Sequence, residues 1–387
     1  MLSEVEALSH ILDATRPLPS SDVPLLEAVG YFAARDLFAT VALPGFDQSS
    51  MDGYALRSAD PSPLRVVGEQ AAGENRNLSI GPGETIRIFT GAPMPRGADA
   101  VLMQEDAERI NDTMQIKEPV EAGENVRRAG GDLAPGQKLI SRGEEITPQM
   151  VGLLASQGLM SIAAGTAPRI RIVSTGTELR AAGSPLEAGT MYESNGPLLA
   201  ALSQRWGAHV EGLAIAPDEH AALAEQIAWG LEADVLVISG GVSVGDHDLV
   251  KPVLSELGVD LNLWRVALRP GKPFAFGTKN QTLVFGLPGN PVSAFVTFLI
   301  FGRPALRKLA GASSFENPTI PLVTTQDISN PGDRPHYLRG KKDGDRFIPV
   351  GLQESHALYG LSRSDALARI EAKSSLPAGS WLSALIW

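Results

Sequence analysis

The feature that most constrains the fold is an alternation of apolar runs and helical segments that begins after Pro168. "RIRIVST" (169–175), "DVLVIS" (234–239) and "TLVFGL" (282–287) are predicted strands, and the second has the continuous apolar character of a strand buried on both faces. Helical patterns separate and follow these runs. Repeated strand–helix units predict a doubly wound, mostly parallel sheet with helices on both faces.

Capping residues set the helix boundaries in this region. Asn195 is predicted to cap a helix that ends at Gly207, and Asp218 is predicted to cap the next helix. A third helix should start near Asp246, and a long apolar helix should run from about Pro291 to Leu309.

The regions on either side of this alternation have different sequence patterns. Ser3 and Glu6 form a predicted capping box at the start of a short amphipathic helix, and "TPQMVGLLASQG" (147–158) is a second predicted helix. Residues 64–142 and those after Asn317 contain short strand-like runs between Gly and Pro residues. We expect an α/β domain flanked by β-rich domains: residues 1–50 with 143–168 as a discontinuous helical and linking domain, 51–142 as a β-rich domain, 169–316 as the α/β domain, and 317–387 as a C-terminal β-domain.

The amino-acid composition limits the cellular location and the binding partners that we expect. The 387 residues include 33 Lys and Arg against 44 Asp and Glu, so the net charge is 33 − 44 = −11. This charge argues against nucleic acid or an anionic membrane as the partner, and an anionic substrate would need a local cluster of cations. No apolar stretch approaches the roughly 20 residues of a membrane helix. The absence of cysteine fits a reducing compartment, so we expect a cytoplasmic protein.

Three unusual loops follow the predicted strands. They are "STGTEL" (174–179), "SGGVSVGDHD" (239–248) and "GLPGNPVSA" (286–294). Ligands of open parallel sheets bind at the carboxyl ends of the strands, so these loops should share one edge. Plainer interpretations remain open: the first loop could be a helix start capped by Thr177, and the second only a turn. Neither a dinucleotide fingerprint nor a Walker loop is present.

Four carboxylates are expected at the same edge. Glu178, Asp218, Asp246 and Asp248 fall at or near predicted helix starts. Hard cations such as Mg²⁺ use one or two carboxylates together with substrate phosphate oxygens, so this set suits a phosphate-containing substrate. Helix capping is the alternative for Asp218 and Asp246.

Cations gather in two further segments. Arg265, Arg269 and Lys272 lie around the rigid sequence "RPGKP", which suits an oxyanion, whereas a solvated strand end is the alternative for Arg265. Arg127 and Arg128 precede "AGGD" in the β-rich region, where solvent exposure is the usual explanation.

The segment "PGFDQSSMDGYAL" (44–56) concentrates polar residues in one loop. Asp52 and Gly53 alone indicate a tight turn, because Asp tolerates and Gly readily adopts a left-handed backbone. That interpretation leaves the neighbouring hydroxyls and Tyr54 unexplained.

The chain resembles the molybdopterin molybdenumtransferase family, whose animal relative forms the C-terminal part of gephyrin. The resemblance runs in order through "PGFDQSSMDGYAL", "FTGAPMPRGADAVLMQED", "NVRRAGGDLAPGQ", "STGTEL", "SNGPLL", "GGVSVGDHD", "RPGKPFAFG" and "GLPGNPVSAF". Each motif alone is weak, whereas eight in sequence are specific. Arg265 and Arg269 stand where some members of the family carry lysine.

The resemblance implies an elongated homodimer of four-domain subunits with active sites shared between subunits. Its substrates would be adenylylated molybdopterin and molybdate; molybdate is inserted at the dithiolene, AMP is released, and Mg²⁺ assists. It also suggests a molybdopterin adenylyltransferase and proteins of molybdoenzyme maturation as partners. Asp52 would act on a substrate or metal held by the other subunit.

The resemblance also implies the site residues. The catalytic set would be Asp52, Thr90, Asp132, Glu178, Asp218 and Asp248. The metal ligands would be Glu178, Asp218, Asp246 and Asp248. The substrate-binding set would be Arg127, Thr175, Gly176, Ser239, Gly240, Gly241, Ser243, Arg265, Arg269, Lys272, Pro288, Asn290, Ser293, Arg339 and Ser355.

Two other functions stay open from the sequence. One is a scaffold that keeps the fold without turnover, although a scaffold has no physical need for Asp52, Glu178 and Lys272 together. The other is molybdopterin adenylyltransferase activity, because the α/β domain resembles that enzyme too. The flanking β-rich domains and the motif "MDGYA" favour the insertion step.

Overall fold

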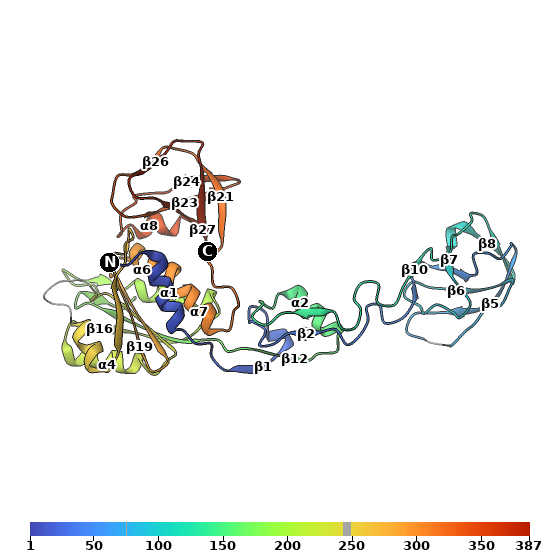
Figure 1. Cartoon of the computed structure of the whole chain (residues 1–387), viewed down its shortest axis with the longest axis horizontal. Coiled ribbons are helices and arrows are strands. Elements are labelled where there is room, and N and C mark those ends of the chain that lie inside the picture. Colours follow the sequence, from blue (N-terminus) through green and yellow to red (C-terminus); the bar gives the residue numbers. More distant parts are fainter. Residues whose placement is uncertain (75, 243–248) are drawn as a thin grey trace. The chain divides into compact units, whose positions relative to one another are not determined.

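The computed structural model of the chain describes residues 1–74, 76–242 and 249–387 (Figure 1). It separates into two compact units. The larger unit comprises residues 1–35, 142–151 and 160–387, and the smaller unit comprises residues 36–141 and 152–159. No helix in the described ranges is long and apolar enough to cross a membrane.

A six-stranded sheet forms the centre of the larger unit. Its strand order is β16-β13-β17-β20-β19-β18; the first four strands are parallel, and β19 and β18 are antiparallel to their neighbours. Every residue of β17 is buried, as its apolar sequence predicts. The strands are β13 (Arg169–Thr175), β16 (His209–Ala216), β17 (Val235–Ser239), β18 (Asp260–Arg265), β19 (Pro273–Lys279) and β20 (Thr282–Leu287).

Helices cover both faces of this sheet, which confirms the predicted fold class (Figure 1). Alternate residues of each strand bury their side chains on opposite faces: Ile172 packs against one group of helices, and Val173 against the other. The first group is α1 (Glu4–Ala14), α3 (Asn195–Arg205), α6 (Pro291–Thr297) and α7 (Arg303–Leu309). The second group is α4 (His220–Gly230) and α5 (Val250–Glu256).

The predicted long helix is one continuous helical run with a π-helical segment, Phe298–Gly302, between α6 and α7. Its aromatic side chains pack against those of the sheet: Phe298 packs edge-on against Phe285, and Phe301 packs against Phe274. A fully buried aromatic side chain of this kind contributes about 1.5–3 kcal/mol through the hydrophobic effect.

The capping box at the N-terminus is confirmed. Glu6 donates its backbone N–H to the Ser3 hydroxyl at 3.2 Å, and the Glu6 carboxylate accepts the Ser3 backbone N–H at 2.8 Å. Ala7 and Ile11 then turn their side chains into the core of the α/β domain.

Two predicted helix caps are wrong. Asn195 lies inside α3, buried, and its side chain bonds to Ser239 and Gly289 instead of to the helix start. Asp218 lies before α4 and bonds to Thr177. The helix start proposed for "STGTEL" is also absent, because the short strand β14 (Leu179–Arg180) follows Thr177.

The C-terminal region forms a closed β-barrel, as the short strand-like runs predict. The barrel order is β21-β24-β23-β25-β27. A short helix, α8 (Leu358–Ser362), precedes β25. The barrel strands are β21 (Thr319–Thr324), β23 (His336–Asp343), β24 (Arg346–Pro349), β25 (Ala366–Ile370) and β27 (Trp381–Ile386); β22 (Ile328–Asn330) pairs with β26 (Ser374–Leu376) outside it.

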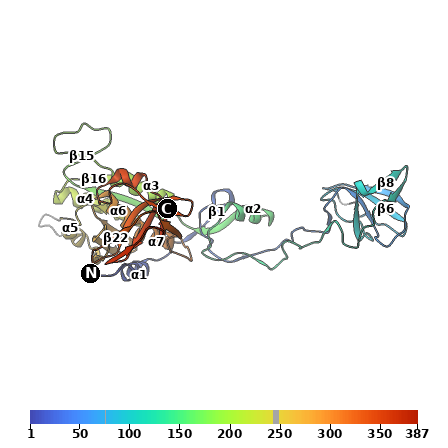
Figure 2. The same cartoon turned by 90° about the horizontal axis from the view of Figure 1, so that it is seen from above.

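Short ladders complete the larger unit. β1 (Ser20–Pro24) pairs with β12 (Ser161–Gly165), and η1 (Leu25–Glu27) follows β1. β14 pairs with β15 (Met191–Tyr192), and Figure 2 shows β15 at the base of a loop that extends from the α/β domain.

The smaller unit is β-rich, as predicted. Its six-stranded sheet has the order β7-β4-β6-β5-β9-β8, and two short ladders pair β10 with β3 and β11 with β2. The helix α2 (Pro148–Ser156) crosses the division between the units. The other elements are β2 (Leu37–Phe38), β3 (Gln48–Ser49), β4 (Gly53–Leu56), β5 (Leu64–Gln70), β6 (Glu84–Ile88), β7 (Ala100–Met103), η2 (Gln104–Asp106), β8 (Ala107–Ile110), β9 (Thr113–Ile116), β10 (Val126–Arg127) and β11 (Lys138–Ile140).

Candidate functional site

The carboxyl ends of the central parallel strands align at one edge of the sheet. Ser174 of β13 is in register with Ser239 of β17, which is in register with Leu287 of β20. The structure therefore brings Thr175, Ser239 and the loop that starts at Leu287 together, as the sequence predicts.

Gly240 and Gly241 pack closely against Thr175. Both have positive φ angles, 96° and 62°, which favour glycine. A side chain on Gly240 would place its Cβ 2.7 Å from the Thr175 carbonyl and 2.8 Å from the Thr175 hydroxyl, and a Cβ on Gly241 would lie 3.0 Å from the same hydroxyl. We call Thr175, Gly240 and Gly241 the glycine cradle.

Two buried oxygens near the cradle have no hydrogen-bond partner within the described part of the chain: Thr175 Oγ1 and Asn195 Oδ1. The Asn195 amide Nδ2 donates to Ser239 Oγ at 2.8 Å and to the Gly289 carbonyl at 2.7 Å, so the position of its oxygen is fixed. Buried acceptors of this kind are costly unless something supplies a donor, so the cradle is suited to a ligand rich in N–H or O–H groups.

Two of the four predicted metal ligands can be placed. Asp218 Oδ2 accepts the Thr177 N–H at 3.3 Å, Thr177 Oγ1 accepts the Asp218 N–H at 3.2 Å, and the exposed Glu178 carboxylate lies over Gly176. The other two, Asp246 and Asp248, lie outside the described residues, as does Ser243. The described ranges alone contain no group of three acidic, His or Cys side chains that could hold a metal.

A pocket of about 290 Å³ lies between the α/β domain and the barrel, both in the larger unit. We call it the Lys272 pocket. It contains six of the predicted substrate-binding residues and four that the sequence did not single out. The predicted residues are Arg269, Lys272, Pro288, Asn290, Ser293 and Ser355; the additional ones are Arg334, His336, Gln353 and Glu354.

Three cations line this pocket, and Arg334 alone among them pairs with a described carboxylate, the exposed Asp333, at 3.5 Å. Neither Arg269 nor Lys272 has an ion pair with any described residue. The backbone between them is constrained at Gly271, where φ is 116° and an added Cβ would lie 2.4 Å from Thr297 Cγ2. Fixed, unpaired cations favour the binding of an anion.

His336 stays neutral in this setting. It is 6% exposed, and burial together with the charges of Arg269 and Arg339 lowers its pKa to about 4. At neutral pH, His336 therefore adds no positive charge to the Lys272 pocket.

Arg339 lies beneath the pocket instead of lining it. It is 1% exposed, and its guanidinium donates to the carbonyls of Leu352, Glu354 and Ala357. These contacts hold the segment that carries Ser355, whose hydroxyl accepts the Asn290 amide at 3.0 Å. Arg265 is exposed at the end of β18 and is not among the lining residues.

The smaller unit places Asp52 and Thr90 in direct contact. Asp52 Oδ1 accepts both the backbone N–H and the hydroxyl of Thr90, each at 2.8 Å. These bonds, chiefly the backbone one, lower the pKa of Asp52, and the charge of Arg87 adds to the effect. Arg87 is itself held over the rings of Tyr54 and Phe89. We call Asp52, Thr90 and Arg87 the Asp52 cluster.

The rest of the motif around Asp52 serves the local fold. The Ser49 hydroxyl donates to the Met51 carbonyl at 2.6 Å, and Asp47 pairs with Arg128 at 2.7 Å. Gly53 is a strand residue and not part of a left-handed turn: an added Cβ would lie 1.9 Å from the Leu102 carbonyl oxygen.

Arg127 and Asp132 are exposed in the same unit. In the described structure neither forms a hydrogen bond or ion pair with Asp52; Arg127 belongs to β10, and the Asp132 backbone bonds to Leu43. The structure thus joins two of the predicted residues of this unit, Asp52 and Thr90, and leaves the other two apart.

Most of the site residues that sequence reasoning missed come from positions with no motif. Arg334, His336 and Gln353 lie in or near the barrel and reach the pocket only through tertiary packing. Asn195 had a signal, because it lies in "SNGPLL", but its polar side chain before a helical pattern indicated a cap.

Three family descriptions match successive parts of the chain. Residues 2–158 match the MoeA N-terminal region (domain I and II), residues 171–308 a probable molybdopterin binding domain, and residues 321–387 the MoeA C-terminal region (domain IV).

Relatives match along nearly the full length. A molybdopterin molybdenumtransferase of Haemophilus influenzae is 34% identical over 384 residues, covering 96% of this chain and 95% of the relative. Molybdopterin molybdenumtransferase 2 of Mycobacterium tuberculosis is 34% identical and covers 94% and 93%. The crystal structure of a molybdopterin biosynthesis MoeA protein of Pyrococcus horikoshii OT3 is similar with a TM-score of 0.88, at 27% identity and with 100% of both chains covered. The chain therefore belongs to the MoeA family, the molybdopterin molybdenumtransferases.

Proposed function

We propose that this protein inserts molybdate into the dithiolene of adenylylated molybdopterin and releases AMP, giving the molybdenum cofactor. The observation that carries this proposal is that one loop, residues 288–290 between β20 and α6, borders both the glycine cradle and the Lys272 pocket. Gly289 lies against Gly240 of the cradle, while Pro288 and Asn290 line the pocket. A ligand in the cradle and an anion in the pocket would therefore lie on two sides of the same turn.

The Lys272 pocket suits a tetrahedral dianion. Lys272 and Arg269 supply unpaired positive charge, and Ser293, Asn290 and Ser355 supply neutral polar groups. Rigid donors of this kind stabilise an oxyanion because they need no reorganisation when it binds. We assign molybdate to this pocket.

The cradle suits the pterin end of the other substrate. Thr175 Oγ1 and Asn195 Oδ1 are buried acceptors, and a pterin ring carries N–H groups that would satisfy them. Gly176, Gly240 and Gly241 have no side chains beside it, Ser239 offers a hydroxyl, and backbone N–H groups at such positions can bind phosphate.

Mg²⁺ fits this edge in donor chemistry, because the predicted ligands are carboxylate oxygens only. Glu178 and Asp218, together with Asp246 and Asp248, would hold it. Bound there, it would neutralise charge on the phosphoanhydride that is broken when AMP leaves.

We also propose that the active enzyme is a homodimer in which Asp52 of one subunit serves the substrate bound by the other. Support comes from the way the predicted site residues are divided between the two units. The Asp52 cluster belongs to the smaller unit, whereas the cradle and the Lys272 pocket belong to the larger one. Arg127 and Asp132 would assist Asp52. The division into four domains follows the same resemblance.

The direct test is incubation of the protein with adenylylated molybdopterin, Mg²⁺ and molybdate, with AMP release and activation of a molybdenum-free apoenzyme as the two readouts. AMP release that requires molybdate, together with active apoenzyme, would support the proposal. A parallel arm with tungstate would show which oxyanion is used. Nucleotide binding without AMP or cofactor would indicate a scaffold instead, and formation of the adenylylated substrate from ATP would indicate an adenylyltransferase.

Mixing two inactive variants tests the shared site. Asp52→Ala and Glu178→Ala chains, after confirmed subunit exchange, should regain part of the activity, because some hybrid dimers contain one site with both native residues. Absence of any recovery would contradict the sharing of active sites between subunits.

A further inference from the structure

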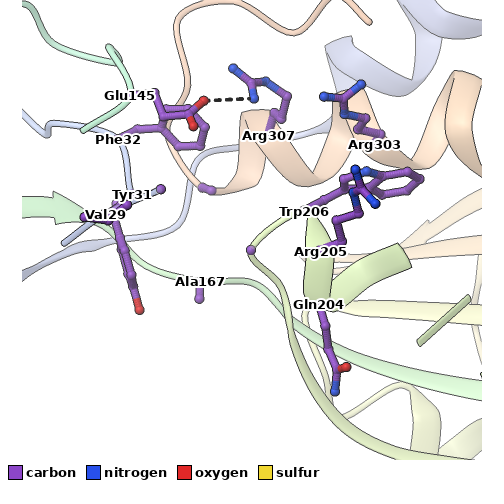
Figure 3. A pocket seen from close by; sticks show the side chains of 14 residues that line it. Val29, Tyr31, Phe32, Glu145, Ala167, Gln204, Arg205, Trp206, Arg303 and Arg307 are labelled. Atoms are coloured by element: carbon purple, nitrogen blue, oxygen red, sulfur yellow. Dashed lines mark hydrogen bonds and ion pairs between the residues drawn. The ribbon is translucent and has the colours of Figure 1, made fainter. Parts of the chain in front are cut away.

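A second pocket lies at the opposite edge of the α/β sheet (Figure 3). Ala167 precedes β13 and Gly207 precedes β16, and because these neighbouring strands are parallel, both residues mark their amino ends. The volume is about 360 Å³, within the range of small-molecule pockets. We call it the Arg303 pocket. It shares no lining residue with the Lys272 pocket.

Three arginines line the Arg303 pocket. Arg303 and Arg307 lie four residues apart on α7 and thus on one face of the helix, and Arg205 ends α3. Figure 3 shows Arg205 and Arg303 beside Trp206, with Arg307 directed toward Glu145. Glu145 is the single carboxylate among the lining residues. Three cations thus face one carboxylate in a chain whose net charge is −11.

The arginines retain unused hydrogen-bond donors. Arg307 donates to Glu145 Oε2 at 3.3 Å and to the Ser314 carbonyl at 3.2 Å. Arg303 donates once, to Asn317 Oδ1 at 3.3 Å, and the Arg205 side chain has no hydrogen bond or ion pair within the described ranges. Because each guanidinium carries five N–H donors, most of the donors here remain available to a ligand.

Aromatic rings hold two of these arginines in place. The Arg307 guanidinium lies 4.9 Å from the Phe32 ring centre, and that of Arg303 lies 5.8 Å from Trp206. Trp206 is itself fixed against Phe298, with ring centres 5.4 Å apart. The cations are therefore preorganised, which lowers the entropic cost of binding.

The cations also repel one another. Burial lowers the pKa of Arg303, and the charges of Arg307 and Arg205 act in the same direction, whereas Glu145 acts against them. An added anion would relieve this repulsion.

We propose that the Arg303 pocket binds a small multiply charged oxyanion, a pyrophosphate or phosphate ester, through Arg205, Arg303 and Arg307. Guanidinium forks match pairs of phosphate oxygens, and partial burial strengthens these contacts. Glu145, whose side chain is 49% exposed, would yield its contact with Arg307 to the more highly charged ligand. The pocket is independent of the proposed chemistry at the opposite edge.

The test is isothermal titration of the full chain with pyrophosphate. A Lys272→Ala background removes a principal cation of the other pocket, so that the remaining binding can be assigned. We expect saturable binding of one pyrophosphate with a Kd below about 1 mM, and at least tenfold weaker binding when Arg205→Gln and Arg303→Gln are combined. The matched control combines Arg109→Gln and Arg346→Gln, two exposed arginines elsewhere, and should bind as the background does.

The single variant Arg205→Gln controls for unfolding, because Arg205 is exposed and its substitution should leave the melting temperature unchanged. This variant should still weaken binding several-fold. Absence of saturation at 10 mM pyrophosphate, equal affinity in the double variant, or an equal loss in the control would each overturn the proposal.

Discussion

The Lys272 pocket and the Asp52 cluster both contain predicted site residues, but they differ in the partners of their charged groups. Arg269 and Lys272 have no ion pair with a described residue, and their backbone is fixed by Gly271. Asp52, in contrast, already has two hydrogen bonds from Thr90. The first region has two cations without an ion-pair partner among the described residues, whereas the second holds an ionised carboxylate in one orientation.

This difference separates binding from chemistry. Substitutions in the Lys272 pocket should change affinity for the oxyanion, whereas substitutions in the Asp52 cluster should change turnover with little effect on affinity. Substitutions of Asp52, Lys272, Gly271 and His336 test that separation, in decreasing order of expected effect.

Replacement of Asp52 should have the largest effect. Asp52→Asn keeps the shape of the side chain but removes the charge that Thr90 stabilises, so turnover should fall about a hundredfold or more. Steady-state AMP release measures this, with molybdate affinity by equilibrium dialysis alongside. Glu108→Gln, an exposed carboxylate of the same sheet, is the control. A large loss of molybdate affinity in Asp52→Asn would break the comparison.

Replacement of Lys272 should act on affinity. Lys272→Ala removes an unpaired cation from the pocket and should weaken molybdate binding roughly tenfold to a hundredfold, because a hydrogen bond to a charged group contributes about 1.5–3 kcal/mol. Equilibrium dialysis with molybdate provides the measurement. Lys279→Ala, at the far end of β19, the strand that follows Lys272, should leave the affinity unchanged. Equal affinity in Lys272→Ala and the wild type would remove molybdate from this pocket.

The rigidity of the pocket can be tested through Gly271. Gly271→Ala should destabilise the protein by about 2–3 kcal/mol, because φ is 116° and the new Cβ would meet Thr297 and Leu268. Urea unfolding followed by circular dichroism gives the free energy. Gly344→Ala also has positive φ, 63°, but meets no atom within 4 Å, so its cost should be about 1 kcal/mol. Similar costs for both variants would mean that the close contacts at Gly271 relax freely.

His336 should contribute a small pH dependence. Its folded pKa of about 4 lies below the ordinary value of 6.5, so the stability it contributes is present above pH 6.5 and is lost as the pH falls toward 4. Between pH 7 and pH 5.5 the loss should be about 1 kcal/mol. His336→Gln should flatten the urea-unfolding curve against pH by that amount, and His10→Gln, an exposed control, should not. An unchanged pH dependence in His336→Gln would show that His336 protonates freely in the folded state.

The sequence predicted what local patterns determine. Strand–helix alternation predicted the parallel sheet, and because parallel strands end at one edge, it also predicted that Thr175, Ser239 and Pro288 would lie near one another. The capping box at Ser3 depends on four consecutive residues and was correct for the same reason.

What the sequence did not predict depends on distant packing. Asn195 looks like a cap, yet Ser239 and Gly289 lie close enough in the folded chain to bind its amide. The resemblance implies that Arg339 binds substrate, yet Arg339 is buried and its guanidinium donates to three carbonyl groups of residues 352–357. Gly53 looks like a turn residue, but the neighbouring strand explains it. In each case the partner is separated in sequence from the residue it determines.

The π-helical segment Phe298–Gly302 determines how the residues after it are rotated about the helix axis relative to the residues before it. Such a segment acts as a one-residue insertion, which turns everything after it by about 100° relative to an uninterrupted α-helix. Ser293 before it lines the Lys272 pocket, and Arg303 and Arg307 after it line the Arg303 pocket. Deletion of one residue from this segment would restore regular helical winding, yet it would rotate both arginines off their pocket while Ser293 kept its place. A single extra residue thus allows one helical run to place side chains in pockets at two edges of the same sheet.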